Sequence, residues 1–220
     1  MDKALVEKTK KVITSVSRME SIKPYILVGG TALSLQISHR LSEDLDFMRW
    51  QSRKGERMDI NVSLIKKELK KNFAAIAVNI LEFNHVEFLI DEEVKLSFYA
   101  PEKRSPNMKT VPYLNNLVLA DEDTIASLKM ETMMRRTLFR DYYDLYCILS
   151  EKRAEEMKSI INNALKYSGH NLKSKTLLGL LVNSNRFKED STFHLLEPKF
   201  PVTVKEIEAF MIEKVKAAIS

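Results

Sequence analysis

The chain has a single cysteine among its 220 residues, so no disulfide can form within it. Cys147 lies in the apolar run DLYCIL, where we expect a buried, reduced thiol rather than a thiolate metal ligand. No apolar run approaches the roughly 18 residues needed to cross a bilayer. The opening residues, MDKALVEKTKK, do not have the apolar core of a secretory signal. We therefore expect a cytoplasmic protein with no membrane partner.

Histidine is also scarce, and its spacing argues against a zinc site. The four residues are His39, His85, His170 and His194. None of them pairs with another at the i, i+3 or i, i+4 spacing that brings two ligands to one helix face. The chain also has no internal repeat and no low-complexity tract, so a repeat architecture is not expected.

The chain has enough apolar residues for a folded core, and its basic residues outnumber its acidic ones. Hydrophobic residues make up 45% of it, and the net charge is +5 with a pI near 9.1. This excess mildly favours a polyanionic partner. One cluster, Lys66, Lys67, Lys70 and Lys71, has the density needed to meet phosphates, although a solvated helix face is the alternative interpretation.

The most informative segment is ILVGGTALSLQISHRLSEDLDF, residues 26–47. Residues 25–28 read as a short buried strand, and Gly29 and Gly30 permit a tight turn in which peptide N–H groups approach a ligand closely. Thr31 would open the following helix. A helix N-terminus carries unpaired N–H donors and partial positive charge, so this turn is a candidate seat for phosphate.

Two carboxylates follow the turn. Asp44 and Asp46 are two residues apart, so in a strand they stand on the same face. Two adjacent anions repel each other unless a cation lies between them, and hard oxygen ligands of this kind suit Mg²⁺ that bridges to substrate phosphates. The segment therefore predicts a site for a nucleoside triphosphate and one or two Mg²⁺ ions.

The rest of the pattern predicts an α+β fold, with a mixed sheet and flanking helices followed by a helical lobe. Strands are expected at residues 74–83, 86–90 and 94–99, with residues 91–93 as a hairpin turn. Prolines punctuate a polar connection over residues 100–116, where we expect a boundary or a mobile lip. The predicted domains are residues 1–116 and 117–220, with a cleft between them. Helices are expected over residues 5–19, 61–73, 121–136, 154–167, 175–183 and 204–219.

The segment from Gly29 to Phe47 resembles the nucleotidyltransferase signature of the DNA polymerase β superfamily, and in particular the AbiEii/AbiGii toxin family. The family pattern is Gly-Gly-Thr-Ala-Leu, a helix, and then Arg-x-Ser-x-Asp-x-Asp-Phe. Arg40, Ser42, Asp44 and Asp46 reproduce its second half. The resemblance implies a polymerase β-like core in residues 1–116, with Asp44 and Asp46 as catalytic metal ligands. Gly29, Gly30, Thr31, Arg40 and Ser42 are implied nucleotide-binding residues. Ser42 has an alternative role as a cap of the strand turn.

A second family signature has a Lys on a helix, an Arg about two turns later, and then Arg-Asp-x-x-Asp-Leu. Lys129, Arg136, Arg140, Asp141, Asp144 and Leu145 fit it. The resemblance gives Lys129 a catalytic role, neutralising charge on the leaving pyrophosphate. An ordinary surface lysine is the alternative. Asp141 is a binding candidate, although Arg140 and Asp141 would also serve as a structural ion pair, with Asp144 orienting Arg140.

One position departs from the superfamily pattern. Its members usually add a third carboxylate on a later strand, and we expect that place to be taken here by Ser97, which cannot accept a proton as a carboxylate does. The acidic residues of the hairpin turn, Asp91, Glu92 and Glu93, are candidate replacements. Two carboxylates alone can still hold Mg²⁺, because the ion keeps several water ligands.

The resemblance implies an Mg²⁺-dependent enzyme that moves a nucleoside monophosphate from a triphosphate to an acceptor hydroxyl. It further implies the toxin of a toxin–antitoxin or abortive-infection pair, with RNA, and a tRNA 3′ end in particular, as acceptor and an antitoxin as partner. Two alternatives stay open at this point. One is transfer to a small hydroxylated molecule such as an aminoglycoside, and the other is a degenerate fold that binds nucleotide or RNA without turnover.

Overall fold

A computed structural model describes residues 3–104, 109–168, 172–188 and 190–219. The chain divides into two units, Met1–Asp121 and Glu122–Ser220. The first unit thus extends to Asp121, whereas the sequence placed the domain boundary after Asn116. Two parts of the sequence interpretation, His170 and the middle of the proline-rich connection at residues 105–108, lie outside the described residues.

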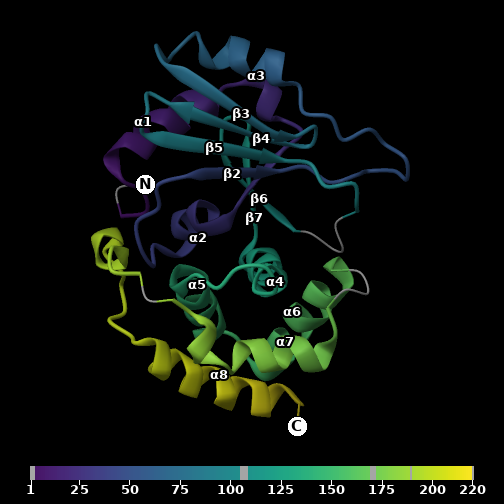
Figure 1. Ribbon diagram of the computed structural model, residues 1–220, viewed down its shortest axis with the longest axis vertical. Coiled ribbons are helices and arrows are strands. Elements are labelled where there is room, and N and C mark those ends of the chain that lie inside the picture. Colours follow the sequence, from purple (N-terminus) through teal and green to yellow (C-terminus); the bar gives the residue numbers. More distant parts are fainter. Residues whose placement is uncertain (1–2, 105–108, 169–171, 189, 220) are drawn as a thin grey trace. The chain divides into compact units, whose positions relative to one another are not determined.

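The first unit is built on a seven-stranded mixed sheet with the order β3-β4-β5-β2-β1-β7-β6 (Figure 1). β2 runs parallel to β5 and β1 parallel to β7, and the remaining neighbours are antiparallel. This confirms the predicted mixed sheet. The strands are β1 (Ile26–Val28), β2 (Leu45–Met48), β3 (Ile76–Glu82), β4 (His85–Ile90), β5 (Val94–Tyr99), β6 (Thr110–Leu114) and β7 (Leu117–Ala120).

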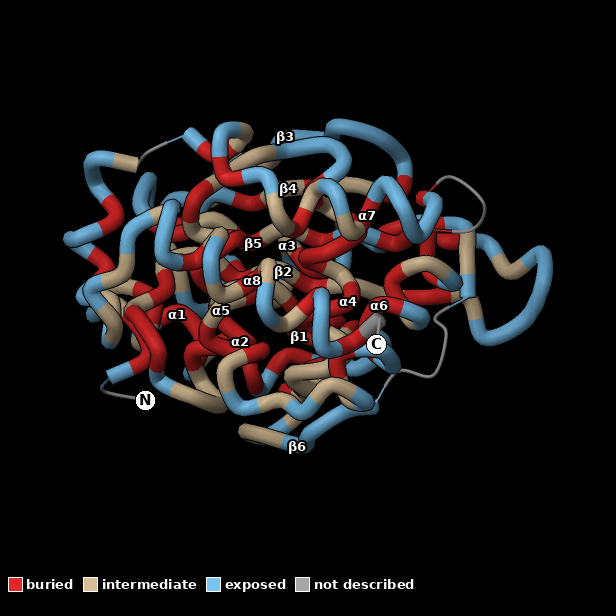
Figure 2. The backbone as a smooth tube through the Cα atoms, turned by 90° about the horizontal axis from the view of Figure 1, so that it is seen from below, coloured by how far each residue is buried: buried red, intermediate tan, exposed pale blue. Residues whose placement is uncertain are grey.

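Strict alternation of side chains gives β2, β4 and β5 one buried face. In β2 and β5 the buried residues include Phe47 and Phe98, whose rings stack with centroids 4.9 Å apart. The residue before each phenylalanine, Asp46 in β2 and Ser97 in β5, is only partly buried, and the two share the other face of the sheet. Figure 2 shows that the edge strand β3 is largely exposed, in contrast to the buried centre of the sheet. Asp46 and Ser97 therefore lie on the face of β2 and β5 opposite the buried phenylalanines.

The helices of the first unit begin and end near the predicted positions. They are α1 (Glu7–Val16), a short 3₁₀ helix η1 (Glu20–Ile22), α2 (Gly29–Ile37) and α3 (Val62–Leu69). α2 begins at Gly29, two residues before the predicted start at Thr31. The connection over residues 100–116 is not a simple lip, because its last part forms β6, which pairs with β7 as a hairpin.

Helices make up the named elements of the second unit, as the sequence predicted, and an isolated bridge pairs Leu138 with Lys188 (Figure 1). The predicted helix over residues 121–136 is too long, because α4 ends at Thr132 and Arg136 lies in the connection to the next helix. The elements are α4 (Glu122–Thr132), α5 (Phe139–Ser150), α6 (Ala154–Tyr167), α7 (Ser174–Leu181), η3 (Ser184–Arg186), η4 (Phe193–Leu196) and α8 (Val204–Ile219). Within the described ranges, none of these helices has the length and apolar content to span a membrane.

Candidate active site

The glycine turn is packed directly against one of the two carboxylates. β1 ends at Val28 and α2 begins at Gly29, whose φ of +70° lies in the left-handed region that favours glycine. A Cβ at this position would lie 2.9 Å from Oδ2 of Asp46. The turn and Asp46 thus lie directly against each other, and a side chain at this position would require the Asp46 carboxylate to shift.

The N-terminus of α2 has the chemistry of an anion cradle. Its N-cap residue, Val28, offers no side-chain cap, and the first turn contains no acidic residue. The leading N–H groups of a helix have no partner within the helix, and the helix dipole places partial positive charge there. Together with the neighbouring carboxylates, this arrangement fits a phosphate that shares a metal ion with the acidic pair.

Arg40 lies beneath the second glycine of the turn. Its side chain is almost fully buried, with 4% of the residue exposed, and its Nη1 donates to the carbonyl of Leu41 at 2.9 Å. A Cβ at Gly30 would overlap Nη2 of this guanidinium. The predicted nucleotide-binding residue Arg40 therefore sits against the turn, where its charge adds to the positive potential of the α2 N-terminus.

The contact with Arg40 gives a stability prediction. We expect Gly30→Ala to lower the free energy of unfolding by about 1–3 kcal/mol, the usual range for overpacking a filled site. Urea denaturation followed by circular dichroism would measure this loss. Gly179→Ala is the matched control, because a Cβ there meets no atom within 4 Å. A Gly30→Ala protein as stable as the wild type would contradict the packing described here.

Two hydroxyl groups tie the turn to the start of β2. Oγ1 of Thr31 lies 2.8 Å from Oγ of Ser42 and also hydrogen-bonds the backbone carbonyl of Asp44. Since a threonine hydroxyl has one proton, donation to the carbonyl leaves its oxygen to accept from Ser42. The backbone N–H of Ser42 donates to the carbonyl of Ala4 at 2.9 Å. Thr31 and Ser42 thus hold the cradle and the Asp44 backbone together, and direct contact of either residue with nucleotide stays a prediction.

The two carboxylates lie at the start of β2. Asp44 directly precedes β2, and in that strand Leu45 and Phe47 are buried while Asp46 is only partly so. Oδ2 of Asp44 lies 3.6 Å from Nζ of Lys95, and both side chains are well exposed, at 38% and 40%. An exposed ion pair of this length is weak. A divalent cation could therefore displace the ammonium at little cost.

The row of side chains beside Asp46 shows what occupies the place of a third carboxylate. Ser97 pairs with Asp46 across β2 and β5, and Glu87 pairs with Ser97 across β5 and β4. Paired residues on neighbouring strands point to the same face, so the three form one row. Lys95 connects both ends of this region, because its Nζ also lies 4.0 Å from Oε1 of Glu87.

Glu87 is an acidic residue of this row that the sequence interpretation did not consider. The signal was available, because a hairpin turn at residues 91–93 that pairs Ile90 with Val94 also pairs Glu87 with Ser97. The turn residues proposed as replacements, Asp91 to Glu93, are exposed, and Asp91 and Glu92 have positive φ. Among the side chains described, no group of three or more His, Cys, Asp or Glu is arranged to hold a metal ion. Asp44 and Asp46 as metal ligands at the turn stay a prediction.

In the second unit, the predicted catalytic lysine lies in a buried ion-pair network. Only 6% of Lys129 is exposed, and its Nζ lies 2.9 Å from Oδ1 of Asp141 and 2.6 Å from Oδ2 of Asp144. Arg136 donates to Asp141 through Nε at 2.7 Å and Nη2 at 2.9 Å. Burial alone would raise the pKa of the Asp141 carboxyl, but Lys129 and Arg136 outweigh it and hold that pKa below its usual value.

These contacts correct two alternatives from the sequence. Lys129 is not a surface lysine, and within the described residues Asp141 pairs with Lys129 and Arg136 rather than with its neighbour Arg140. The network joins α4 to α5 by charge-assisted hydrogen bonds. A structural role is enough to explain it, and contact of Lys129 or Asp141 with the nucleotide stays a prediction.

Comparison with solved structures places this fold among the nucleotidyltransferases. A putative nucleotidyltransferase from Helicobacter pylori superposes with a TM-score of 0.57 at 17% identity, covering 97% of this chain and 96% of that one. MenT4, a nucleotidyltransferase toxin from Mycobacterium tuberculosis, superposes with a TM-score of 0.61 at 16% identity, covering 97% and 82%. At these identities the likeness establishes the fold.

The family follows from the sequence comparison. Residues 14–218 match the family described as nucleotidyl transferase AbiEii toxin, type IV toxin–antitoxin system. The chain therefore belongs to the AbiEii nucleotidyltransferase toxin family, as the glycine and aspartate signatures predicted. An uncharacterized protein of Aquifex aeolicus is 25% identical over 215 residues, which is 96% of each chain.

Proposed function

We propose that the protein is an Mg²⁺-dependent toxin that transfers a nucleoside monophosphate from a triphosphate to a hydroxyl of RNA, with a tRNA 3′ end as the leading candidate. The observation that carries the proposal is the close approach of the glycine turn to Asp46, with Asp44 directly before the strand that holds Asp46. Phosphate-binding N–H groups and metal-binding carboxylates are thereby next to each other. The reaction would take place in the cytoplasm, with an antitoxin as the regulating partner.

In this proposal each residue of the turn has a distinct task. The N–H groups of Gly29 and Gly30 bind the triphosphate, Arg40 adds positive charge behind them, and Thr31 and Ser42 fix the turn to Asp44. Asp44 and Asp46 would hold Mg²⁺, which supplies charge neutralisation to the phosphates and lowers the pKa of the attacking hydroxyl when bound.

The bond changes of the proposed reaction balance without a protein nucleophile. The acceptor oxygen forms a bond to the α-phosphorus while the bond from that phosphorus to the bridging oxygen breaks, and pyrophosphate leaves with the electron pair. The acceptor proton passes to a base or to solvent. No covalent enzyme intermediate is needed, so the protein acts by positioning the groups and stabilising charge.

Transfer is tested by incubating the protein with Mg²⁺, each α-labelled triphosphate in turn, and total tRNA. We expect label on RNA, released by nuclease and absent when EDTA is added. Label on an added aminoglycoside but not on RNA would contradict the RNA acceptor and leave the nucleotidyltransfer intact. Binding of triphosphate without any transfer would favour the degenerate alternative, for which Ser97 in register with Asp46 is the specific observation.

Glu87 gives a second test of the same site. If its carboxylate receives the acceptor proton that Ser97 cannot take, Glu87→Gln should lower the transfer rate by roughly 10²-fold, the lower end for general-base catalysis, with triphosphate affinity unchanged. Glu93→Gln, in the exposed hairpin turn, is the matched control. Equal transfer rates in the two variants, measured by label incorporation, would exclude this role for Glu87.

A further inference from the structure

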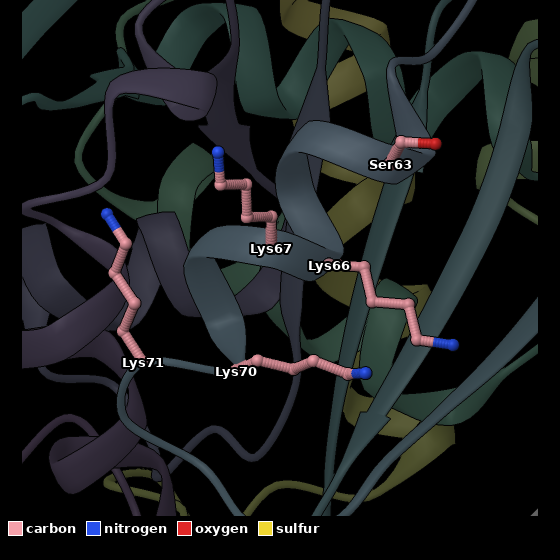
Figure 3. Close-up of a pocket in the computed structure, with 5 residues that line it drawn as sticks. All are labelled: Ser63, Lys66, Lys67, Lys70 and Lys71. Carbon is pink, nitrogen blue, oxygen red and sulfur yellow. The ribbon is translucent and has the colours of Figure 1, made fainter.

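A dense group of lysines lies on α3 and directly after its C-terminal end. Ile65 and Leu69 are buried, while Lys67, Lys70 and Lys71 are exposed and Lys66 is partly so. Together with Ser63, these four lysines line a hollow of about 720 Å³ (Figure 3). We call Lys66, Lys67, Lys70 and Lys71 the α3 lysine patch.

The patch brings like charges together. Lys66 and Lys70 extend to one side of the helix, and Lys67 and Lys71 extend to the other (Figure 3). Lys66 and the C-cap residue Lys70 have the i, i+4 spacing, at which like charges destabilise a helix, and Lys71 follows directly after the helix end. The position near the helix C-terminus offsets part of this cost through the helix dipole, but it does not remove the repulsion between neighbouring ammonium groups.

The acidic residue within α3 does not neutralise the patch, because its carboxylate is used elsewhere. The two oxygens of Glu68 accept hydrogen bonds from the backbone N–H groups of Glu20 at 3.1 Å and Ser21 at 2.9 Å, at the start of η1. Among the residues that the structure describes, Lys66, Lys67 and Lys70 form no ion pair. Lys71 acts on Glu68 only through space, and helps to keep the pKa of that carboxyl low. The positive charge is therefore available to a ligand.

The chemistry of the patch favours a phosphate backbone over an acidic protein. Lysine is depleted in protein–protein interfaces, whose cores exclude charge, whereas interfaces with nucleic acid are polar, wet and strongly positive. An ammonium group on a flexible stem is a point charge that contacts phosphate without reading base sequence. Four such groups around an open hollow suit successive phosphates of a strand.

We propose that the α3 lysine patch binds the sugar–phosphate backbone of the acceptor RNA. This inference rests on the proposed function, because it names a surface that recruits the RNA for the same reaction. The hollow includes neither Asp44 nor Asp46, so the patch holds a part of the RNA away from the reacting hydroxyl. Its loss therefore raises KM for RNA and leaves kcat unchanged.

Binding of fluorescently labelled tRNA, measured by anisotropy over a range of KCl concentrations, tests the patch without requiring turnover. The variant replaces Lys66, Lys67, Lys70 and Lys71 by glutamine. The control replaces Lys11, Lys54, Lys158 and Lys166, which are exposed and scattered, and so makes the same change in net charge. A plot of the logarithm of the association constant against the logarithm of the salt concentration has a negative slope. We expect this slope to become shallower by about 3 in the patch variant, since each phosphate contact contributes roughly 0.7–0.9.

Three outcomes would overturn the proposal. The first is equal affinity and salt slope in the patch and control variants. The second is competition by polyglutamate as strong as that by RNA of equal charge, which would assign the patch to an acidic protein. The proposal expects KM for RNA to rise about tenfold in the patch variant, and the third contrary outcome is a fall in kcat with KM unchanged. A wild-type protein that binds tRNA through the patch but transfers no label would instead count against the proposed function alone.

Discussion

Replacing Asp46 by asparagine should lower the rate of nucleotide transfer by at least about 10³-fold, because a lost metal ligand removes several kcal/mol of charge stabilisation at the transferring phosphate. Asparagine keeps the size of the side chain, so its contact with Gly29 is retained and the fold should be unaffected. Asp44→Asn should have a comparable effect. Incorporation of α-labelled nucleotide, with circular dichroism as the check on folding, is the measurement.

The matched control for these variants is Asp59→Asn. Asp59 is an acidic residue of the same unit that pairs with Arg57 at the surface and has no contact with the glycine turn. Asp59→Asn makes the same change in charge as the two site variants. Because Asp59 lies outside the site, this variant should transfer nucleotide at the wild-type rate. If all three variants kept wild-type activity, the acidic pair would not be the metal site.

Replacing Lys129 by methionine should destabilise the protein by about 3–5 kcal/mol, the usual cost of removing one partner from a buried ion pair. Asp144 would then be left buried with its ammonium partner gone, and Asp141 would keep only Arg136 of its two cationic partners. Guanidinium denaturation of the full chain would measure the loss. Because the folded-state pKa of Asp141 is lowered, its share of the stability is present above the unfolded-state pKa and is lost as the pH falls through the folded-state pKa.

Lys205→Met is the matched control for Lys129→Met. Lys205 also forms an ion pair, with Glu208 at 3.0 Å, but its side chain is 67% exposed, and such pairs contribute about 0–1 kcal/mol. A Lys129→Met protein with wild-type stability but no transfer activity would contradict the structural account. That result would support the catalytic role that the family resemblance gives to this lysine.

β3, β4 and β5 were predictable because their side chains alternate with a period of two, whereas β6, β7 and the end of α4 were not predicted. Apolar residues continue at helical spacing from residue 121 to 149, so the pattern predicts no break. The structure breaks the helix between Thr132 and Phe139, where Arg136 makes a two-bond contact with Asp141. Residues five apart do not face each other on one helix, so this contact requires the chain to leave the helix.

Some features of the candidate site follow from the local sequence, and others depend on contacts between residues far apart in the chain. The shared face of Asp44 and Asp46 follows from alternation, and the turn follows from its glycines. The contact of Gly29 with Asp46, the burial of Arg40 and the register that places Glu87 beside Ser97 depend on strand pairing across the sheet. The burial of Lys129 depends on helix packing, which helical spacing alone does not specify.

The most direct test is the binding of Mn²⁺ as a paramagnetic substitute for Mg²⁺, measured by electron paramagnetic resonance in the presence of a non-hydrolysable triphosphate. The account predicts that the wild-type protein binds Mn²⁺ together with the triphosphate, and that Asp44→Asn and Asp46→Asn each weaken this binding by at least about tenfold. Mn²⁺ affinity that is the same in the wild type and in both variants would contradict the claim that these two carboxylates hold the metal beside the glycine turn.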